Sequence, residues 1–320
     1  MITTSLTTLF GLRYPLVLAP MAGVAGGRLA AAVSNAGALG LVGGGYGNRD
    51  WLQRELTLVR AETEGPWGVG LITWAVDEGV LDYALSFQPH AVMLSFGDPR
   101  RFAPAIKAAG CKLICQVQDV AGAQLAQEAG ADIVVAQGTE GGGHGGARAT
   151  LPLVPIAVDA VAPLPVIAAG GIADGRGLAA ALMLGAHGAL LGTRFFASSE
   201  ALGSAAIKQC LIEATGEQTQ RTQVFDVVRG YHWPPGFTGR AVRNRFMQRW
   251  DGNEAGLTAA LEMERPAFQA AVQADDYDTA MVWASEAVDL IQSTDSAATL
   301  VTRICAQAEA QLRAGAQLLS

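Results

Sequence analysis

The sequence is poor in charged residues and has no excess of positive charge. Only 16% of its 320 residues are charged, and 29 acidic side chains outnumber 22 basic ones, which gives a formal net charge of -7. Disordered chains combine high charge with low hydrophobicity, whereas half of this sequence is hydrophobic. A net acidic surface also repels the phosphates of nucleic acids. The composition therefore predicts a folded protein and argues against a nucleic-acid partner.

Cysteine and long apolar stretches are scarce as well. The four cysteines, Cys111, Cys115, Cys210 and Cys305, form no CxxC pair, which argues against a disulfide scaffold and for a reducing compartment. The first charged residue is Arg13, so the basic start of a signal peptide is missing. A membrane-spanning helix needs about 20 apolar residues, and no stretch reaches this length. These absences predict a cytoplasmic protein without a membrane segment.

Glycine, with 39 residues, is abundant and clusters at the ends of short apolar runs. Continuous runs of leucine, valine and isoleucine are typical of strands buried in a parallel sheet. Eight such runs occur, at residues 15–20, 39–42, 67–72, 91–96, 112–117, 132–137, 165–169 and 188–191. Helical patterns separate them, over residues 28–36, 49–63, 77–87, 99–109, 120–129, 157–161 and 175–184. This alternation predicts a (β/α)8 TIM barrel. A doubly wound open sheet is the alternative, disfavoured because no GxGxxG follows the first run.

The pattern changes after the eighth run. Residues 194–211 read as helical, and residues 212–295 read as a mostly helical appendage with two charged parts. Six arginines against one acid give 221–250 a charge of +5, and ten acids against one arginine give 251–295 a charge of -9. Residues 296–319 carry apolar side chains at helical spacing. We therefore expect residues 1–211 and 296–320 to form the barrel, and 212–295 a helical cap domain.

Two glycine turns follow the last strands of the predicted barrel. Gly170 and Gly171 come after the seventh strand, and Gly192 and Thr193 come after the eighth. Barrels bind ligands at the C-terminal ends of their strands, and phosphate groups bind at these two loops in many of them. Backbone N–H groups in such turns, together with the N-terminus of the helix that follows Gly171, are suited to bind an anion. The turns predict a phosphate site, with turn geometry alone as the alternative.

One histidine stands out among the four. His144 lies in the loop AQGTEGGGHGG after the sixth strand, where three consecutive glycines would let the backbone approach a flat ligand. His90 and His187 fall at the opposite end of the barrel and are interpreted as structural. Imidazole titrates near neutral pH, so His144 is the predicted acid–base residue. The spacings HxxxH, HxH and HExxH of metal sites are absent, as are GxSxG and the P-loop.

The appendage carries a cluster of aromatic residues. Tyr231, His232, Trp233 and Phe237 surround a Pro-Pro pair soon after the eighth strand, at the end where the ligand site is expected. We predict that they cover the barrel mouth and form part of the substrate pocket, because a cover over an active site excludes water. A small core of the appendage or a contact in a homodimer would also explain them. In that case Trp74, after the third strand, is the next candidate.

The motifs PMAG at residues 20–23, AQGTEGGGHGG, AAGGI and LLGTRF together resemble the nitronate monooxygenase family, formerly called 2-nitropropane dioxygenases. The match continues into RTQVFD and WPPGFTGRAVRNRF. The resemblance implies an FMN enzyme with the isoalloxazine ring near Met21 and the 142–144 turn. It implies that Gln116 and Gln137 bond the ring or ribitol. Gly70 stands where the family often has asparagine. The implied cofactor residues are Met21, Ala22, Gly70, Gln116, Gln137, Gly142, Gly143, Gly170, Gly171, Leu190, Leu191, Gly192 and Thr193.

Three functions remain as hypotheses. The first is FMN-dependent oxidation of alkyl nitronates, or of nitroalkanes, by O2 to carbonyl compounds and nitrite. In it, His144 would bind a nitro oxygen or take the α-proton of a neutral nitroalkane. The second is a flavin reductase of quinones or enoyl thioesters that uses NAD(P)H. The third is a flavin-free barrel enzyme of sugar phosphates, because this scaffold hosts many chemistries. All three act on a small-molecule substrate.

Overall fold

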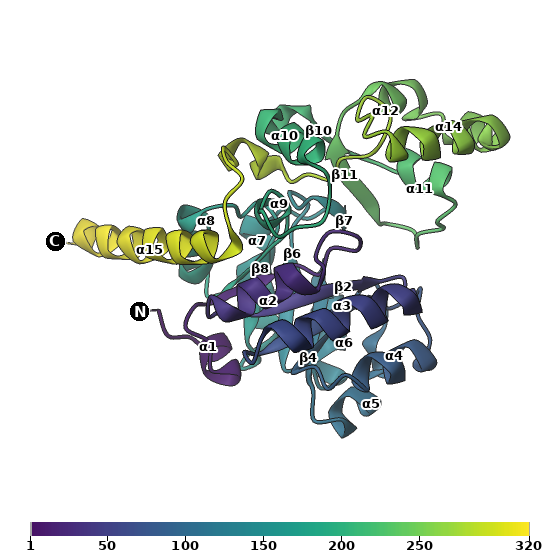
Figure 1. Cartoon of the computed structure of the whole chain (residues 1–320). Coiled ribbons are helices and arrows are strands. Elements are labelled where there is room, and N and C mark those ends of the chain that lie inside the picture. The colour runs from purple at the N-terminus through teal and green to yellow at the C-terminus, as the bar shows by residue number, and fades with distance from the viewer. Residues whose placement is uncertain (1, 320) are drawn as a thin grey trace.

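Eight parallel strands form a closed barrel in the computed structural model, which describes residues 2–319 (Figure 1). The strands are β1 (Leu16–Leu18), β2 (Gly40–Gly45), β3 (Trp67–Ile72), β4 (Ala91–Ser95), β5 (Lys112–Val117), β6 (Ile133–Gln137), β8 (Val166–Ala169) and β9 (Ala189–Leu191). Their order in the sheet is β1-β9-β8-β6-β5-β4-β3-β2. The Leu18 N–H donates to the Leu39 carbonyl oxygen at 2.9 Å, beside a bridge between Val17 and Leu39 that closes the ring. The predicted barrel is confirmed, and the open sheet is excluded.

The strands are buried on both faces. Side chains alternate between the barrel interior and the surrounding helices, because a strand has a side-chain period of two. In β6, Ile133 and Val135 belong to the interior cluster, whereas Val134 and Ala136 pack in the layer beneath the helices. All four are fully buried. Burial on both faces explains why the strands read as continuous apolar runs.

Helices surround the barrel as the sequence predicts. They are α2 (Gly27–Asn35), α3 (Arg49–Glu62), α4 (Glu78–Leu85), α5 (Ala103–Ala108, after the 3-10 turn η1, Pro99–Arg101), α6 (Val120–Glu128), α7 (Thr150–Val161) and α8 (Gly175–Met183). Gly110 and Gly130 follow α5 and α6 with φ of 74° and 78°, a conformation that favours glycine. Helix α7 begins at Thr150 rather than at residue 157, because the Glu140 carboxylate accepts a hydrogen bond from the Thr150 N–H at 3.0 Å.

The N-terminal end of the barrel is covered by α1 (Ser5–Phe10), a helix that the apolar pattern did not predict. Leu6 of α1 packs into the interior cluster. The Thr4 hydroxyl donates to the His187 carbonyl oxygen at 2.6 Å, and His90 Nδ1 accepts from the Trp67 N–H at 3.3 Å. Both histidines therefore lie in structural contacts away from the C-terminal ends of the strands.

The chain between β9 and the last helix includes residues 212–295, the predicted cap. It contains α9 (Thr193–Phe196), α10 (Ala205–Glu213), α11 (Val224–Arg229), α12 (Arg245–Trp250), α13 (Glu254–Ala259), α14 (Leu261–Gln273) and the 3-10 turns η2 (Gly216–Gln218) and η3 (Glu286–Leu290). Residues 194–211 are not one helix, because the Ser204 side chain starts a new helix by accepting from the Ile207 N–H at 3.3 Å. Phe225, Phe246 and Phe268 form a separate core within the helices of the cap.

A small antiparallel sheet joins the cap to the barrel. Its strands are β10 (Thr219–Thr222), β11 (Thr238–Val242) and β7 (Gly143–Gly145), and β7 belongs to the loop after β6. In this sheet His144 lies opposite Gly239. The sequence analysis missed the sheet, because TQRT, TGRAV and GHG are short and lack an alternation of apolar and polar residues.

The chain returns to the barrel as α15 (Ala297–Ala316), followed by the turn η4 (Gln317–Leu319). Helix α15 lies against α8 and α2 (Figure 1). Contact with α8 is so close that a Cβ atom at Gly175 would lie 2.3 Å from Gln307 Cβ. Helix α15 therefore completes the outer layer of helices around the barrel.

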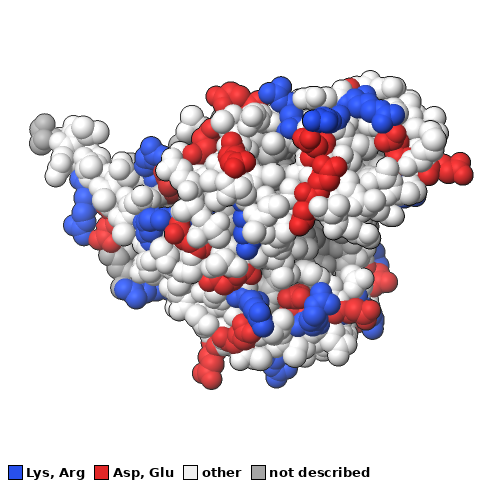
Figure 2. All heavy atoms as spheres, turned by 45° about the horizontal axis from the view of Figure 1, so that its top comes forward, with Lys and Arg blue, Asp and Glu red and all other residues white. Residues whose placement is uncertain are grey.

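Charges of both signs are interspersed on the face shown in Figure 2. Within the cap, Arg249 pairs with Glu264 at 3.0 Å and Arg245 pairs with Asp278 at 3.3 Å, so some of its basic and acidic residues face each other. Exposed pairs of this kind contribute only about 0–1 kcal/mol each. None of the helices in residues 2–319 is long and apolar enough to span a membrane.

Candidate active site

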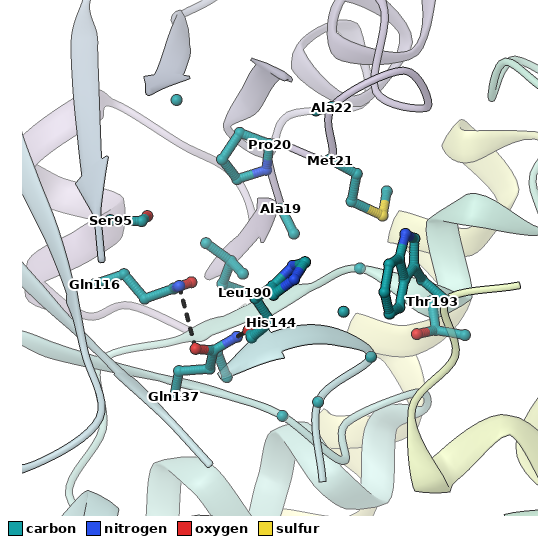
Figure 3. A pocket seen from close by; sticks show the side chains of 18 of the residues that line it. Ala19, Pro20, Met21, Ala22, Ser95, Gln116, Gln137, His144, Leu190 and Thr193 are labelled. Carbon is teal, nitrogen blue, oxygen red and sulfur yellow. Dashed lines mark hydrogen bonds between the residues drawn. The ribbon is translucent and has the colours of Figure 1, made fainter. Parts of the chain in front are cut away.

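A cavity lies at the C-terminal ends of the barrel strands, and residues of the cap form part of its wall (Figure 3). Met21 and His144 both project into it (Figure 3). Fourteen of the residues singled out from the sequence line the cavity: Met21, Ala22, Gly70, Gln116, Gln137, Gly142, Gly143, His144, Gly170, Gly171, Leu190, Gly192, Thr193 and Trp233. The structure thus brings together residues that lie far apart in the sequence, from Met21 to Trp233.

Four other predicted residues do not line the cavity. Leu191 is buried in the layer beneath the helices, since its neighbour Leu190 occupies the interior face of β9. Trp74 and Tyr231 pack behind the cavity wall, and His232 is exposed. The expectation that these four contact a ligand is not supported by their positions.

His144 is held by an acidic partner that the sequence analysis did not select. Its Nε2 lies 2.8 Å from Asp226 Oδ2, and the two side chains are only 10% and 5% exposed. Asp226 comes from α11 of the cap, 82 residues further along the chain. Its only sequence signal is that it is the single acid in the basic segment 221–250. Because an ionised carboxylate only accepts hydrogen bonds, Nε2 carries the hydrogen and Nδ1 keeps its lone pair.

Burial controls the protonation of His144. Desolvation lowers the pKa of the imidazole from its ordinary value of 6.5, and nearby Arg229 and Arg221 lower it further. The hydrogen bond and charge of Asp226 act in the opposite direction without reversing the shift. Trp233 covers one face of the ring, with ring centroids 3.6 Å apart and an angle of 3° between the planes. His144 is therefore a neutral base at neutral pH.

A network of glutamines positions the loop of His144. The Gln137 side chain donates to the His144 carbonyl oxygen at 2.9 Å and accepts from Gln116 at 3.2 Å (Figure 3). It also accepts from Gln118 at 2.8 Å. Both ends of the Gln137 amide therefore make hydrogen bonds within the protein, and its N–H group fixes the backbone of His144. The Gln116 oxygen has no bond in this network, so it can accept from a ligand.

The same loop is tied to the cap. Arg240 Nε donates to the Thr139 carbonyl oxygen, and Arg221 Nε donates to the Thr139 hydroxyl, both at 3.0 Å. Ser285 Oγ donates to the Glu140 carbonyl oxygen at 2.7 Å. Burial lowers the pKa of Arg221 to about 10, so the guanidinium remains charged at neutral pH. The cap therefore fixes the position of the histidine loop.

The turns predicted to bind phosphate differ in one respect from expectation. Gly170 and Gly171 have φ of 95° and 72°, as such turns require. Helix α8, however, begins only at Gly175, and the Asp174 side chain accepts from two of its first N–H groups. The N-terminus of the helix after Gly171 is thus occupied by its own capping residue. By contrast, α9 begins at Thr193 without a side-chain cap.

Protein packing requires glycine at several positions of the cavity wall, among them Gly70 and Gly142. A Cβ atom at Gly70 would lie 2.2 Å from Pro20 Cγ, so a residue with a side chain does not fit here unless Pro20 moves. A Cβ atom at Gly142 would lie 2.7 Å from the Ala284 carbonyl carbon and 2.8 Å from the Ser285 nitrogen. Gly142 is therefore needed where the cap crosses the loop, rather than for contact with a flat ligand.

Aromatic residues close one side of the cavity. Tyr46 stacks on Tyr231 with ring centroids 4.1 Å apart, and the Trp233 indole N–H donates to the Tyr46 hydroxyl at 3.2 Å. Burial raises the pKa of Tyr46 to about 12, so its hydroxyl stays protonated. The sequence analysis missed Tyr46, although it follows β2 in a glycine-rich turn like those used to select the other loops. Further unpredicted residues of the wall are Ser95, Phe96, Phe196, Arg229, Trp283 and Ser285.

No group of three or more His, Cys, Asp or Glu side chains that could hold a metal ion is found among residues 2–319. The site contains one buried histidine, its carboxylate partner and glycine turns at the ends of barrel strands. This arrangement defines a (β/α)8-barrel enzyme that acts on a small molecule.

Solved structures share this whole architecture. FabK from Thermotoga maritima superposes with a TM-score of 0.89 at 30% identity, over 99% of this chain and 100% of that one. Nitroalkane oxidase from Streptomyces ansochromogenes gives a TM-score of 0.84 at 29% identity, over 98% of this chain and 99% of that one. The cap is included in both superpositions, since they cover almost the full chains.

The family model for nitronate monooxygenase matches residues 3–79 and 72–307. The chain therefore belongs to the nitronate monooxygenase family and is an oxidoreductase. A probable nitronate monooxygenase of Staphylococcus aureus strain Newman is 30% identical in an alignment that covers 94% of this chain and 96% of that protein. A Mycobacterium tuberculosis relative is 36% identical over 263 residues, covering 81% of this chain and 72% of that protein. The latter is a dehydrogenase of a hydroxy-methyl-oxo-octahydro-indene-carboxyl-CoA.

Proposed function

We propose that the protein is an FMN-dependent enzyme that oxidises alkyl nitronates with O2 to carbonyl compounds and nitrite. The observation that carries this proposal is the pairing of His144 with Asp226 at 2.8 Å inside the cavity. The pair supplies a neutral base with a defined free nitrogen, beside glycine turns suited to a cofactor. The family membership supports the same chemistry.

The residues of the cavity fit FMN. Gly170, Gly171 and Gly192 expose backbone at the ends of β8 and β9, where N–H groups can meet a phosphate without a basic side chain. A Cβ atom at Gly192 would lie 3.4 Å from Met21 Sδ, so it would occupy cavity space between the two loops. Gln116 can accept from the ring or the ribitol through its free oxygen. When bound, FMN would take electrons from the substrate and pass them to O2.

His144 would act on the substrate through Nδ1. Asp226 holds the hydrogen on Nε2, so the lone pair on Nδ1 can take the α-proton of a neutral nitroalkane. A nitronate has already lost this proton and needs no base. Its oxygens only accept hydrogen bonds, so His144 would hold one of them only when Nδ1 also carries a hydrogen. Trp233 and the cap shield the ring from water, which strengthens electrostatic interactions within the site.

The second candidate is an oxidoreductase of acyl-CoA or enoyl thioesters with NAD(P)H as electron donor. The M. tuberculosis relative supports only the thioester substrate class, since that protein is named a carboxyl-CoA dehydrogenase, and a dehydrogenase takes electrons from its substrate rather than from NAD(P)H. The scaffold alone does not decide between the two, because one fold hosts many reactions.

Anaerobic mixing of the purified protein separates the candidates. We expect a yellow protein whose heat-released flavin is FMN and whose flavin spectrum is bleached by ethyl nitronate. Bleaching by NADPH, with no response to the nitronate, would favour the thioester reductase. A colourless protein would contradict both and would support a flavin-free barrel enzyme.

A further inference from the structure

One charged side chain faces the cavity. Of the cavity-lining residues within the described part of the chain, Arg229 alone is a Lys, Arg, Asp or Glu. It is the last residue of α11, and its guanidinium lies over the Tyr231 ring, 4.6 Å from the ring centroid. The side chain is 22% exposed, so its charge is partly removed from water.

Arg229 has unused hydrogen-bond donors. The nearest carboxylate oxygen is Asp226 Oδ1, 3.9 Å from Arg229 Nη1, which is an ion pair but too long for a hydrogen bond. This ion pair is the polar contact that the guanidinium makes within the described residues, and Asp226 Oδ1 is itself buried without a hydrogen bond. None of the Arg229 nitrogens is among the buried side-chain atoms without a partner, so its N–H donors face water or the cavity, where a ligand can accept from them.

We propose that Arg229 binds a planar oxyanion of the substrate, in which two oxygens accept from the guanidinium fork. A nitronate and a carboxylate both have this shape, and Arg matches it better than Lys because its donors are coplanar. The source of the oxyanion is either the reacting nitronate group or a carboxylate elsewhere on the substrate. The nitronate source rests on the proposed function, whereas the binding of the oxyanion does not.

The position of Asp226 places this oxyanion beside His144. One oxygen of Asp226 bonds His144 Nε2, and the other faces Arg229, so the base and the guanidinium flank the same carboxylate. A group bound to Arg229 therefore lies on the same side of the cavity as His144. Asp226 already balances part of the positive charge of Arg229. The guanidinium therefore selects a ligand by the planar geometry of its two oxygens as well as by its negative charge.

Direct binding is the first test. The purified enzyme is titrated calorimetrically with sodium propionate and with sodium nitrite, for wild type, Arg229→Gln and Arg245→Gln. Arg245 is a matched control, since it is a cap arginine with an 82% exposed side chain outside the cavity. We expect Arg229→Gln to raise both Kd values about 10- to 100-fold, the usual effect of losing hydrogen bonds to a charged group. Arg245→Gln should bind as wild type does.

Kinetics then identify the source of the oxyanion. If it is the reacting group, Arg229→Gln raises KM for ethyl nitronate and leaves KM for neutral nitroethane unchanged. If it is a separate carboxylate, KM rises for propionate 3-nitronate and stays unchanged for ethyl nitronate. Equal KM changes for nitroethane and for both anions would overturn the proposal, because they would assign Arg229 a structural role.

The variant Arg229→Lys distinguishes a loss of oxyanion binding from a folding defect. This variant keeps the charge and loses the fork, so it should fold like wild type and still bind propionate several-fold more weakly. Unchanged Kd values in both Arg229 variants would overturn the proposal. If wild type binds propionate through Arg229 but never oxidises a nitronate, the oxyanion site stands and the proposed function fails.

Discussion

The protonation of His144 depends on neighbours with opposite effects. Burial, Arg229 and Arg221 lower its pKa, and Asp226 raises it. In wild type we expect the acid limb of kcat/KM for neutral nitroethane to lie below pH 6.5, since only the neutral imidazole can take a proton. Asp226→Asn removes the raising effect and should move the limb to lower pH. Arg229→Gln removes a lowering effect and should move it to higher pH.

The pH–rate profiles of the two variants are compared over the range in which both remain folded. If both variants move the acid limb in the same direction, this account is wrong. Opposite shifts could not come from a general loss of structure, which would affect both variants alike. Asp226→Asn should also lower kcat, since the amide no longer holds the Nδ1 lone pair toward the substrate.

Removal of the imidazole itself should separate the two kinds of substrate. His144→Ala is expected to lower turnover of nitroethane about 10²- to 10⁴-fold more than turnover of ethyl nitronate, because the nitronate needs no general base. The loop should keep its place, since Gln137 bonds the backbone of residue 144 rather than the side chain. Flavin content and both rates are measured on one preparation. Equal losses on both substrates would exclude a role as general base.

Adding a methyl group at Gly70 should lower the free energy of unfolding. Gly70→Ala places Cβ 2.2 Å from Pro20 Cγ, and overpacking of this kind typically costs about 1–3 kcal/mol. We expect a lower Tm and weaker flavin retention. Gly315→Ala is the control, since this position in α15 has no atom within 4 Å of the added Cβ. Alanine favours a helix interior by about 0.5–1 kcal/mol, so the control should be neutral or stabilising. A Gly70→Ala protein as stable as wild type would mean that Pro20 can move.

At the scale of elements, the segment between α11 and β11 carries neighbouring side chains with different roles. Trp233 lines the cavity and stacks on His144, whereas His232 is exposed. Trp233→Ala should raise KM for nitronates several-fold, since aromatic pairs contribute about 0.5–1.5 kcal/mol beyond their buried area. His232→Ala should leave KM unchanged. A large loss of Tm with unchanged KM for Trp233→Ala would place the indole in the core rather than in the pocket.

The barrel elements were predictable from sequence, because strands buried on both faces leave continuous apolar runs. The sheet of β7, β10 and β11 was not, because its stability comes from pairing with distant segments rather than from its own side chains. The sequence analysis assigned both Leu190 and Leu191 to the cofactor site. The side-chain period of a strand could have excluded one of them, since only one of two consecutive residues faces the interior. Asp226 was beyond reach, because its partner lies 82 residues away.

At the scale of the whole molecule, the cap and the barrel are joined by a common sheet and by hydrogen bonds. The sheet of β10 and β11 takes its third strand from the barrel, and Arg240 of the cap donates to Thr139 of the barrel loop. We therefore expect a single cooperative thermal transition, seen at the same Tm by calorimetry and by near-ultraviolet circular dichroism. Two separated transitions would show that residues 212–295 unfold independently.

The chain leaves the barrel and re-enters it at adjacent points. The Ser199 N–H donates to the Asp295 carbonyl oxygen at 3.0 Å, beside a bridge between Ser198 and Asp295. Everything between these residues is an insertion whose two ends already meet. Its length can therefore change without stretching the barrel, because closing such a loop costs little more when the loop grows. Recombination at this junction offers a route to exchange the substrate-facing wall while the glycine turns at the strand ends stay as they are.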